Sequence, residues 1–238
     1  MIVEDDNWLV VNKPADLVCH PTKGDAYSSL ISRARLYLGN ATPHLINRLD
    51  RETSGIVIIA KQLEIARQLR RIWEQRRVEK TYLAIVHGAL EPWDGVFDWP
   101  TGKDVQSQVA IKDCVRPDGA PSRTVYRVER VFQRNGEPFS LVELKPETGR
   151  KHQIRIHLAQ AGHPIVGDKL YGGDEQLYLS FVTGKLTDEQ RARLILPNQA
   201  LHARRVAFEW NGSQKIFACD PESWFVDFLA PPEKERRD

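Results

Sequence analysis

The chain of 238 residues is 41% hydrophobic and 28% charged, which is typical of a globular protein with a substantial core. Its formal net charge of +2 is too small to indicate a nucleic-acid partner by itself. No apolar run approaches the roughly 18 residues that a membrane span needs, and the acidic start MIVEDD lacks the regions of a signal peptide. Cys19, Cys114 and Cys219 are far apart and follow no disulfide or metal-binding spacing. We therefore expect a cytoplasmic protein with reduced thiols, no membrane association and no bound metal.

The hydrophobic pattern predicts strands and helices in an irregular order along the chain. Two short strands are expected around an Asn-Lys-Pro turn in the first 20 residues. Further strands are predicted at 55–61, 80–88, 122–132, 139–146, 200–210 and 214–220, and helices at 28–39, 63–77, 150–162 and 186–196. The stretch 91–119 is expected to form loops and short hairpins, and 163–173 a loop with a short extended piece.

Strands and helices do not alternate regularly, so the pattern predicts an α+β fold with a mostly antiparallel sheet. The chain contains neither an internal repeat nor a linker long enough to separate domains. We therefore expect one domain over residues 1–230, followed by a frayed tail at 231–238.

Basic residues are gathered in three segments of this nearly neutral chain. Between Arg67 and Lys80, six basic residues stand against two acidic ones. The other segments are GRKHQIRIH (149–157) and HARR (202–205). Together they predict one polyanion-binding face, although a solvated helix surface is the commoner explanation for any single run.

The usual motifs of cofactor and metal chemistry do not occur. The sequence has no phosphate-binding glycine loop, no dinucleotide-binding turn and no serine in a nucleophile elbow. His152 and His157 are five residues apart, which would turn them away from a shared metal on a helix. The sequence thus gives no indication of a cofactor.

Asp50 lies between two arginines, Arg48 and Arg51, in the segment NRLDRETSG. An adjacent arginine keeps a carboxylate ionised and orients it, although a plain surface ion pair is the commoner explanation. Tyr82, on a predicted strand, could stack on a nucleobase, and Arg155 lies in the second basic segment. Cofactor-free chemistry on a nucleic acid is the hypothesis that uses all of these residues.

Five segments, in order, resemble the RluA-type pseudouridine synthases, which isomerise uridine to pseudouridine in structured RNA. LVVNKPADLVCHP (9–21) looks like the opening block of the family, RLDRETSGIVIIAK (48–61) its catalytic block and KTYLAIVHG (80–88) its tyrosine block. TGRKHQIRIHLAQAGHPIVGDKLYG (148–172) is similar to the long closing motif, and LHA (201–203) to a late strand.

The resemblance implies a role for four residues. Asp50 matches the essential aspartate, Tyr82 the tyrosine that packs against the target base, and Arg155 the arginine that forms a salt bridge with the aspartate. Ile154 matches an apolar residue of the base pocket. The implied fold is α+β, with a central, mostly antiparallel mixed sheet flanked by helices and loops, and the implied reaction needs no cofactor.

Two residues depart from the family pattern, and the first of them lies next to the segment of Asp50. Asn47 stands where histidine is common, and Asp16 where glycine is common. An N-terminal basic RNA-binding domain of the kind found in many members is not expected. The RNA partner could therefore be a stem-loop of either tRNA or rRNA. The protein is expected to be a monomer.

The target uridine is expected to be flipped into the pocket. Arg48 would then fill the vacated position or grip a neighbouring phosphate. Asp50 could attack C1′ or take the C2′ proton, and the sequence leaves both routes open. Residues expected to contact RNA are Arg51, Lys80, Arg150, Lys151, Arg70 and Arg71.

Two other functions would use the same residues. A non-catalytic RNA-binding or RNA-chaperone protein could be built on this fold. A hydrolytic glycosidase could use Asp50 and Glu52 as a carboxylate pair, but the arginines beside Asp50 favour a permanent anion over a proton donor.

Overall fold

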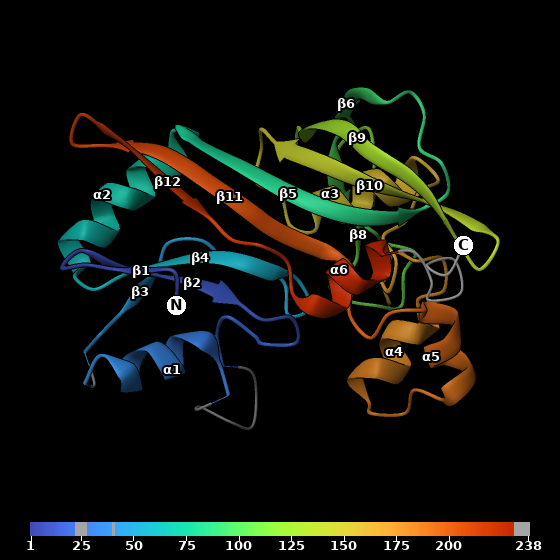
Figure 1. Cartoon of the computed structure of the whole chain (residues 1–238), viewed down its shortest axis with the longest axis horizontal. Helices are drawn as coiled ribbons and strands as arrows, with labels where there is room; N and C mark the ends of the chain where they lie inside the picture. The colour runs from blue at the N-terminus through green and yellow to red at the C-terminus, as the bar shows by residue number, and fades with distance from the viewer. Residues whose placement is uncertain (22–27, 40, 231–238) are drawn as a thin grey trace. The chain divides into compact units, whose positions relative to one another are not determined.

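The structure is a computed structural model that describes residues 1–21, 28–39 and 41–230. The chain divides into two compact units (Figure 1). The first unit comprises residues 1–81 and 202–222, and the second begins at Tyr82, ends its first segment at Leu201 and resumes at Ser223. Two strands, β5 (Val78–His87) and β11 (Leu201–Trp210), have residues in both units.

The first unit contains a mixed sheet with the strand order β1-β2-β4-β11. β3 also pairs with β4, and β12 pairs with β11. The pair β4–β11 is parallel, whereas the other pairs of this unit whose register is known are antiparallel. The elements are β1 (Val3–Glu4), β2 (Trp8–Lys13), α1 (Leu30–Tyr37), β3 (His44–Leu45), β4 (Ser54–Ala60), α2 (Leu63–Glu74) and β12 (Ser213–Ala218), with the parts of β5 and β11 in this unit.

The core of the first unit lies between α2 and the sheet. Every residue of β4 is buried, which agrees with its continuous apolar sequence. α2 places Ala66 and Leu69 against Ile56 and Ile58, because these helix positions recur on one face. This packing fixes the start of β4, directly after the segment that contains Asp50.

The second unit contains an antiparallel sheet with the order β5-β10-β9-β6, and the separate pair β7–β8. Ile154 and Leu158 of α3 belong to its core, together with residues of β5 and β10. α4 and α5 lie side by side (orange in Figure 1), joined by a hydrogen bond between Gln190 and Ser180. The elements are β6 (Asp94–Asp98), β7 (Thr101–Lys103), β8 (Asp113–Val115), β9 (Arg123–Arg134), β10 (Glu137–Pro146), α3 (Gln153–Gln160), α4 (Gln176–Val182), α5 (Asp188–Leu194) and α6 (Ser223–Leu229).

The α+β class and the mostly antiparallel sheet are confirmed. A second strand in the first 20 residues after the Asn-Lys-Pro turn was wrongly predicted, since 17–19 is irregular. The helix predicted to reach 77 ends at Glu74, because Arg76 has a left-handed backbone (φ +57°). No helix was predicted at the positions of α4 and α6. β6, in the stretch expected to form loops and short hairpins, pairs with β9 in the sheet of the second unit.

The predicted frayed tail at 231–238 lies outside the described residues, and the prediction of a single domain stays a prediction. None of the helices in the described part of the chain is long and apolar enough to cross a membrane.

Candidate functional site

Asp50 lies in the irregular segment between β3 and β4 of the first unit. Its side chain is half-buried, between the buried Leu49 and the exposed Arg51. The Asp50 carbonyl accepts a hydrogen bond from the N–H of Thr53 (3.2 Å), which turns the chain into β4. Arg48 is exposed. The chain therefore presents Asp50 from a turn attached to a fully buried strand.

Lys13, at the end of β2, holds this turn from within the first unit. It is 0% exposed, and its Nζ donates to the carbonyls of Pro14 (2.9 Å), Leu17 (2.8 Å) and Arg51 (3.0 Å). Burial lowers the pKa of Lys13 to about 8, although nearby negative groups, Asp50 among them, act in the opposite direction. Lys13 thus stays protonated near neutral pH, with three N–H groups for three carbonyls. Lys13 lies in the segment LVVNKPADLVCHP, but no role was predicted for it.

The two departures from the family pattern have structural explanations. Asn47 donates to the Ile56 carbonyl and accepts from the Ile58 N–H, both at 2.9 Å, so its amide bridges the edge of β4. Asp16 has a left-handed backbone (φ +66°), which glycine adopts most easily and aspartate tolerates. Its carboxylate accepts a hydrogen bond from Arg51 Nε at 2.7 Å, in an exposed ion pair.

Gly55 allows β4 and β11 to approach closely. It has φ +114°, and a Cβ atom there would lie 2.3 Å from the carbonyl oxygen of Ala203. The parallel pairing places His202 beside Ser54, whose hydroxyl lies 2.8 Å from Nδ1 of the histidine. Only glycine fits between these backbones, five residues after Asp50.

In the second unit, a buried polar network builds the start of α3. The amide of Gln153 accepts from the Thr148 hydroxyl (2.7 Å) and donates to Thr124 Oγ1 (2.9 Å). His152, just before the helix, is left-handed (φ +56°), so α3 begins at Gln153 rather than at the predicted residue 150. This network fixes the helical turn that carries Ile154 and Arg155, each 6% exposed.

Arg155 forms a buried, two-pronged ion pair with Asp168. Its Nε donates to Oδ2 at 2.7 Å and its Nη2 to Oδ1 at 2.8 Å. Burial alone would raise the pKa of Asp168, but the charge and hydrogen bonds of Arg155, with two backbone N–H groups, outweigh burial and lower it. Asp168 was not predicted as a site residue, although it lies in the closing motif, within GDKLYG.

Tyr82 is half-buried on β5, where it pairs with Leu144 of β10 and packs against the core of the second unit. The predicted strand for Tyr82 is therefore confirmed. Its proposed contact with a base stays a prediction.

The residues predicted to contact RNA differ in their surroundings. Arg70 and Arg71 are exposed on α2. Lys80 is half-buried, and burial, followed by the charge of Arg76, lowers its pKa. In the second unit, Lys151 pairs with an aspartate of β8 (2.9 Å), and the exposed Arg150 donates from Nε to the Pro121 carbonyl (3.1 Å).

The predicted site residues are thus divided between the units. The first unit holds Asp50, Arg48, Arg51, Lys80, Arg70 and Arg71, and the second holds Tyr82, Ile154, Arg155, Arg150 and Lys151. The predicted ion pair between Asp50 and Arg155 would join the units, and it stays a prediction.

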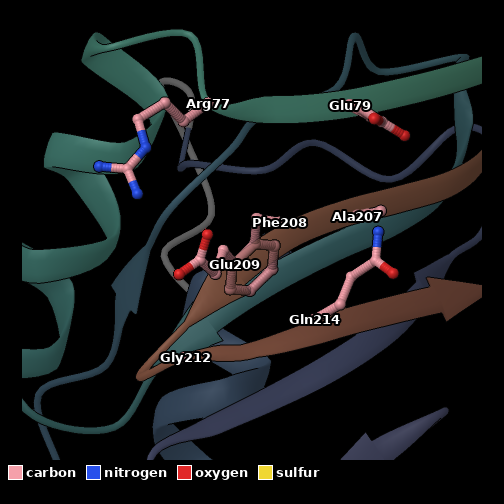
Figure 2. Close-up of a pocket in the computed structure, with 7 residues that line it drawn as sticks. All are labelled: Arg77, Glu79, Ala207, Phe208, Glu209, Gly212 and Gln214. Atoms are coloured by element: carbon pink, nitrogen blue, oxygen red, sulfur yellow. The ribbon is translucent and has the colours of Figure 1, made fainter.

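A cavity of about 350 Å³ lies elsewhere in the first unit (Figure 2). Two carboxylates and one arginine give it mixed charge, so it does not favour phosphate. Within the described residues, no group of three or more His, Cys, Asp or Glu side chains is arranged to hold a metal ion. The residues lining the cavity are Arg77, Glu79, Ala207, Phe208, Glu209, Gly212 and Gln214, none of which is a predicted site residue.

The described residues thus combine an α+β fold with a half-buried aspartate in one unit and a buried arginine clamped by a carboxylate in the other. Residues 7–160 match the model of the family described as RNA pseudouridylate synthase. The chain belongs to this family, and its predicted membership of the RluA type is confirmed.

Similar curated proteins, named as pseudouridine synthases, occur in several bacteria. The chain is 37% identical over 211 residues to ribosomal large subunit pseudouridine synthase D of Nitrosomonas europaea, covering 85% of this chain and 56% of the relative. It is 32% identical over 231 residues to an uncharacterized RNA pseudouridine synthase of Helicobacter pylori, covering 96% of this chain and 75% of the relative. The chain therefore spans little more than half the length of some curated relatives.

The fold is also similar to a solved structure. Human RNA pseudouridylate synthase domain containing 4 has a TM-score of 0.73 and 28% identity, with 96% of this chain and 90% of that chain covered. This likeness agrees with the fold class predicted from the sequence.

Proposed function

We propose that this chain is an RNA pseudouridine synthase that isomerises uridine in structured RNA. The observation that carries the proposal is the family match over residues 7–160, a span that includes Asp50, Tyr82, Ile154 and Arg155. The buried clamp of Lys13 on the turn of Asp50 supports it, since a catalytic carboxylate must be held in place.

The proposed reaction breaks the C1′–N1 bond of uridine and forms a C1′–C5 bond. The uracil rotates between these steps, N1 takes up a proton, and the hydrogen at C5 is lost to water. The composition of the nucleotide does not change, so the reaction needs neither an oxidant nor a reductant. A uridine within a stem or loop is flipped out of its stack first, at a cost of a few kcal/mol.

Asp50 is the proposed catalytic residue, either as the nucleophile at C1′ or as the base that takes the C2′ proton. Both routes require the ionised carboxylate, which Arg155 would stabilise through a charge-assisted hydrogen bond. Tyr82 would pack against the target base, and Ile154 would line the apolar side of its pocket. Arg48 would fill the vacated position or grip the neighbouring phosphate.

We propose that exposed arginines of α2 contact the RNA backbone. Arg70 and Arg71 lie three and four positions after Arg67, so each of them neighbours Arg67 on the helix surface. Arg67 lies 3.7 Å from Glu64, in a weak, exposed pair, and neither Arg70 nor Arg71 makes an ion pair with a carboxylate of the described residues. The charge of Arg70 also lowers the pKa of His44, after the effect of burial, so the positive field extends over β3. Arg51, Lys80, Arg150 and Lys151 are proposed as further contacts.

Large-subunit ribosomal RNA is the first substrate to test, because several relatives are named ribosomal large subunit pseudouridine synthases. A tRNA stem-loop remains the second. The chain would be offered in-vitro transcripts of both RNAs that contain uridine labelled with tritium at C5. A pseudouridine synthase releases tritium to water from one of them, whereas a protein that only binds RNA shifts the transcripts in a gel and releases none.

A further inference from the structure

We propose that Asp168 is a positioning residue that fixes the guanidinium of Arg155 in the orientation needed to pair with the catalytic carboxylate. This inference rests on the proposed function. Asp168 would not touch the substrate, and it would act on the reaction only through Arg155.

The guanidinium of Arg155 is held on an edge and on a face. Asp168 takes the edge formed by Nε and Nη2, in a pair whose side chains are 7% and 0% exposed. The ring of Tyr171 covers the face, with its centroid 4.9 Å from Cζ. The hydroxyl of Tyr171 lies 2.9 Å from Nδ1 of His152 and accepts the N–H of Asp113 at 3.2 Å, so this ring is fixed as well. Arg155 cannot rotate about its last bonds without breaking these contacts.

The carboxylate of Asp168 is fixed as firmly as the arginine. Its Oδ1 also accepts the N–H groups of Leu170 (2.9 Å) and Tyr171 (3.0 Å). Two glycines allow the tight loop around it. A Cβ at Gly167, where φ is +81°, would lie 2.3 Å from the Asn198 carbonyl oxygen, and one at Gly172 would lie 2.3 Å from the Asp168 carbonyl oxygen. The loop with the sequence GDKLYG therefore holds the carboxylate of Asp168 in one orientation.

Stability alone explains this pair poorly. Moving two charges out of water costs several kcal/mol for each ion, and well-packed apolar side chains of similar size often serve as well. A buried arginine with a fixed partner is expected where its positive charge must also stabilise a further anionic group. Under the proposed function, that further group is the catalytic carboxylate of Asp50.

The test compares Asp168→Asn and Asp168→Glu with the wild-type chain. Asparagine keeps the shape but loses the charge and places an amide N–H against the guanidinium, whereas glutamate keeps the charge on a longer arm. The readouts are the rate of tritium release from an in-vitro transcript of large-subunit rRNA labelled at C5 of uridine, the KM for this RNA, and thermal unfolding by circular dichroism. Asp174→Asn, which removes an exposed ion pair with Arg193 (3.0 Å), is the matched control.

We expect Asp168→Asn to lower kcat about 10- to 100-fold, as a misplaced catalytic group does, while the KM changes less than about threefold. Asp174→Asn should keep the wild-type rate. In an Arg155→Lys background the same Asp168→Asn change should cost less than about threefold, because lysine cannot form the two-pronged pair. If Asp168→Asn does not fold, Asp168→Glu tests the positioning role instead. This variant should fold and have a lowered kcat with a nearly unchanged KM.

Three results would overturn the inference while leaving the proposed function intact. These are a wild-type kcat in a folded Asp168 variant, an equal loss in the Arg155→Lys background, and a change confined to KM. If the wild-type chain releases no tritium from rRNA or tRNA transcripts, the proposed function is wrong and this inference falls with it.

Discussion

Replacing Gly55 by alanine tests whether the close approach of β4 and β11 holds the turn of Asp50. A side chain at the φ of +114° found at Gly55 is strained by roughly 1–3 kcal/mol. The new Cβ would also lie 2.3, 2.6 and 2.8 Å from three backbone atoms of Ala203, which must move away. Overpacking of this kind adds about 1–3 kcal/mol. We expect the free energy of unfolding to fall by about 2–6 kcal/mol in total.

Gly212→Ala is the matched control in the same unit. Gly212 also has a positive φ (+74°), but a Cβ there would meet no atom within 4 Å. The control should therefore lose only about 1–2 kcal/mol from backbone strain. The free energy of unfolding of both variants is measured by urea titration monitored by circular dichroism. The rate of tritium release, at a temperature where both variants are folded, measures the effect on the turn of Asp50. The reasoning is wrong if Gly55→Ala destabilises the chain no more than Gly212→Ala.

Three further perturbations follow from the contacts described above. Lys13→Met leaves three carbonyls without their buried donor and should cost about 3–5 kcal/mol in urea unfolding, whereas the exposed Lys145→Met should cost less than about 0.5 kcal/mol; similar losses would contradict the clamp. Burial lowers the pKa of His157 below its usual 6.5, so the unfolded chain binds the proton first and stability is lost as the pH falls below 6.5, by up to about 1.4 kcal/mol per pH unit. His157→Gln should reduce the slope of the unfolding free energy with pH between about 7 and 5, and an unchanged slope would refute this. Replacing Arg70 and Arg71 together by glutamine should reduce the salt slope of RNA binding by about 2, measured by gel shift at several salt concentrations; an unchanged slope would exclude α2 from the RNA contact.

The elements with strong periodicity were predicted closely from the sequence. β4 was predicted at 55–61 and spans Ser54–Ala60, and α2 was predicted from 63, where it begins. The start of α3 was misplaced because it depends on the left-handed His152 and on the buried amide of Gln153, whose partners lie up to 30 residues away in sequence. Hydrophobic pattern carries no signal for such contacts.

Only part of the candidate site was predicted, because long-range contacts leave no signal in the local sequence pattern. Motifs identified Asp50 and Arg155, but the residues that hold them, Lys13 and Asp168, were not recognised. A buried lysine on three carbonyls and a buried aspartate in a loop look like ordinary surface residues in a sequence. Their roles depend on burial and on partners that only the folded chain brings together.

The measurement that tests the central claim most directly is tritium release by Asp50→Asn. The variant keeps the shape of the side chain but cannot act as an anion, so it should bind the RNA nearly as the wild-type chain does and release no tritium. Asp6→Asn, at an exposed position of the same unit, should release tritium at the wild-type rate. Turnover by a folded Asp50→Asn variant would contradict the claim that Asp50 is the catalytic residue.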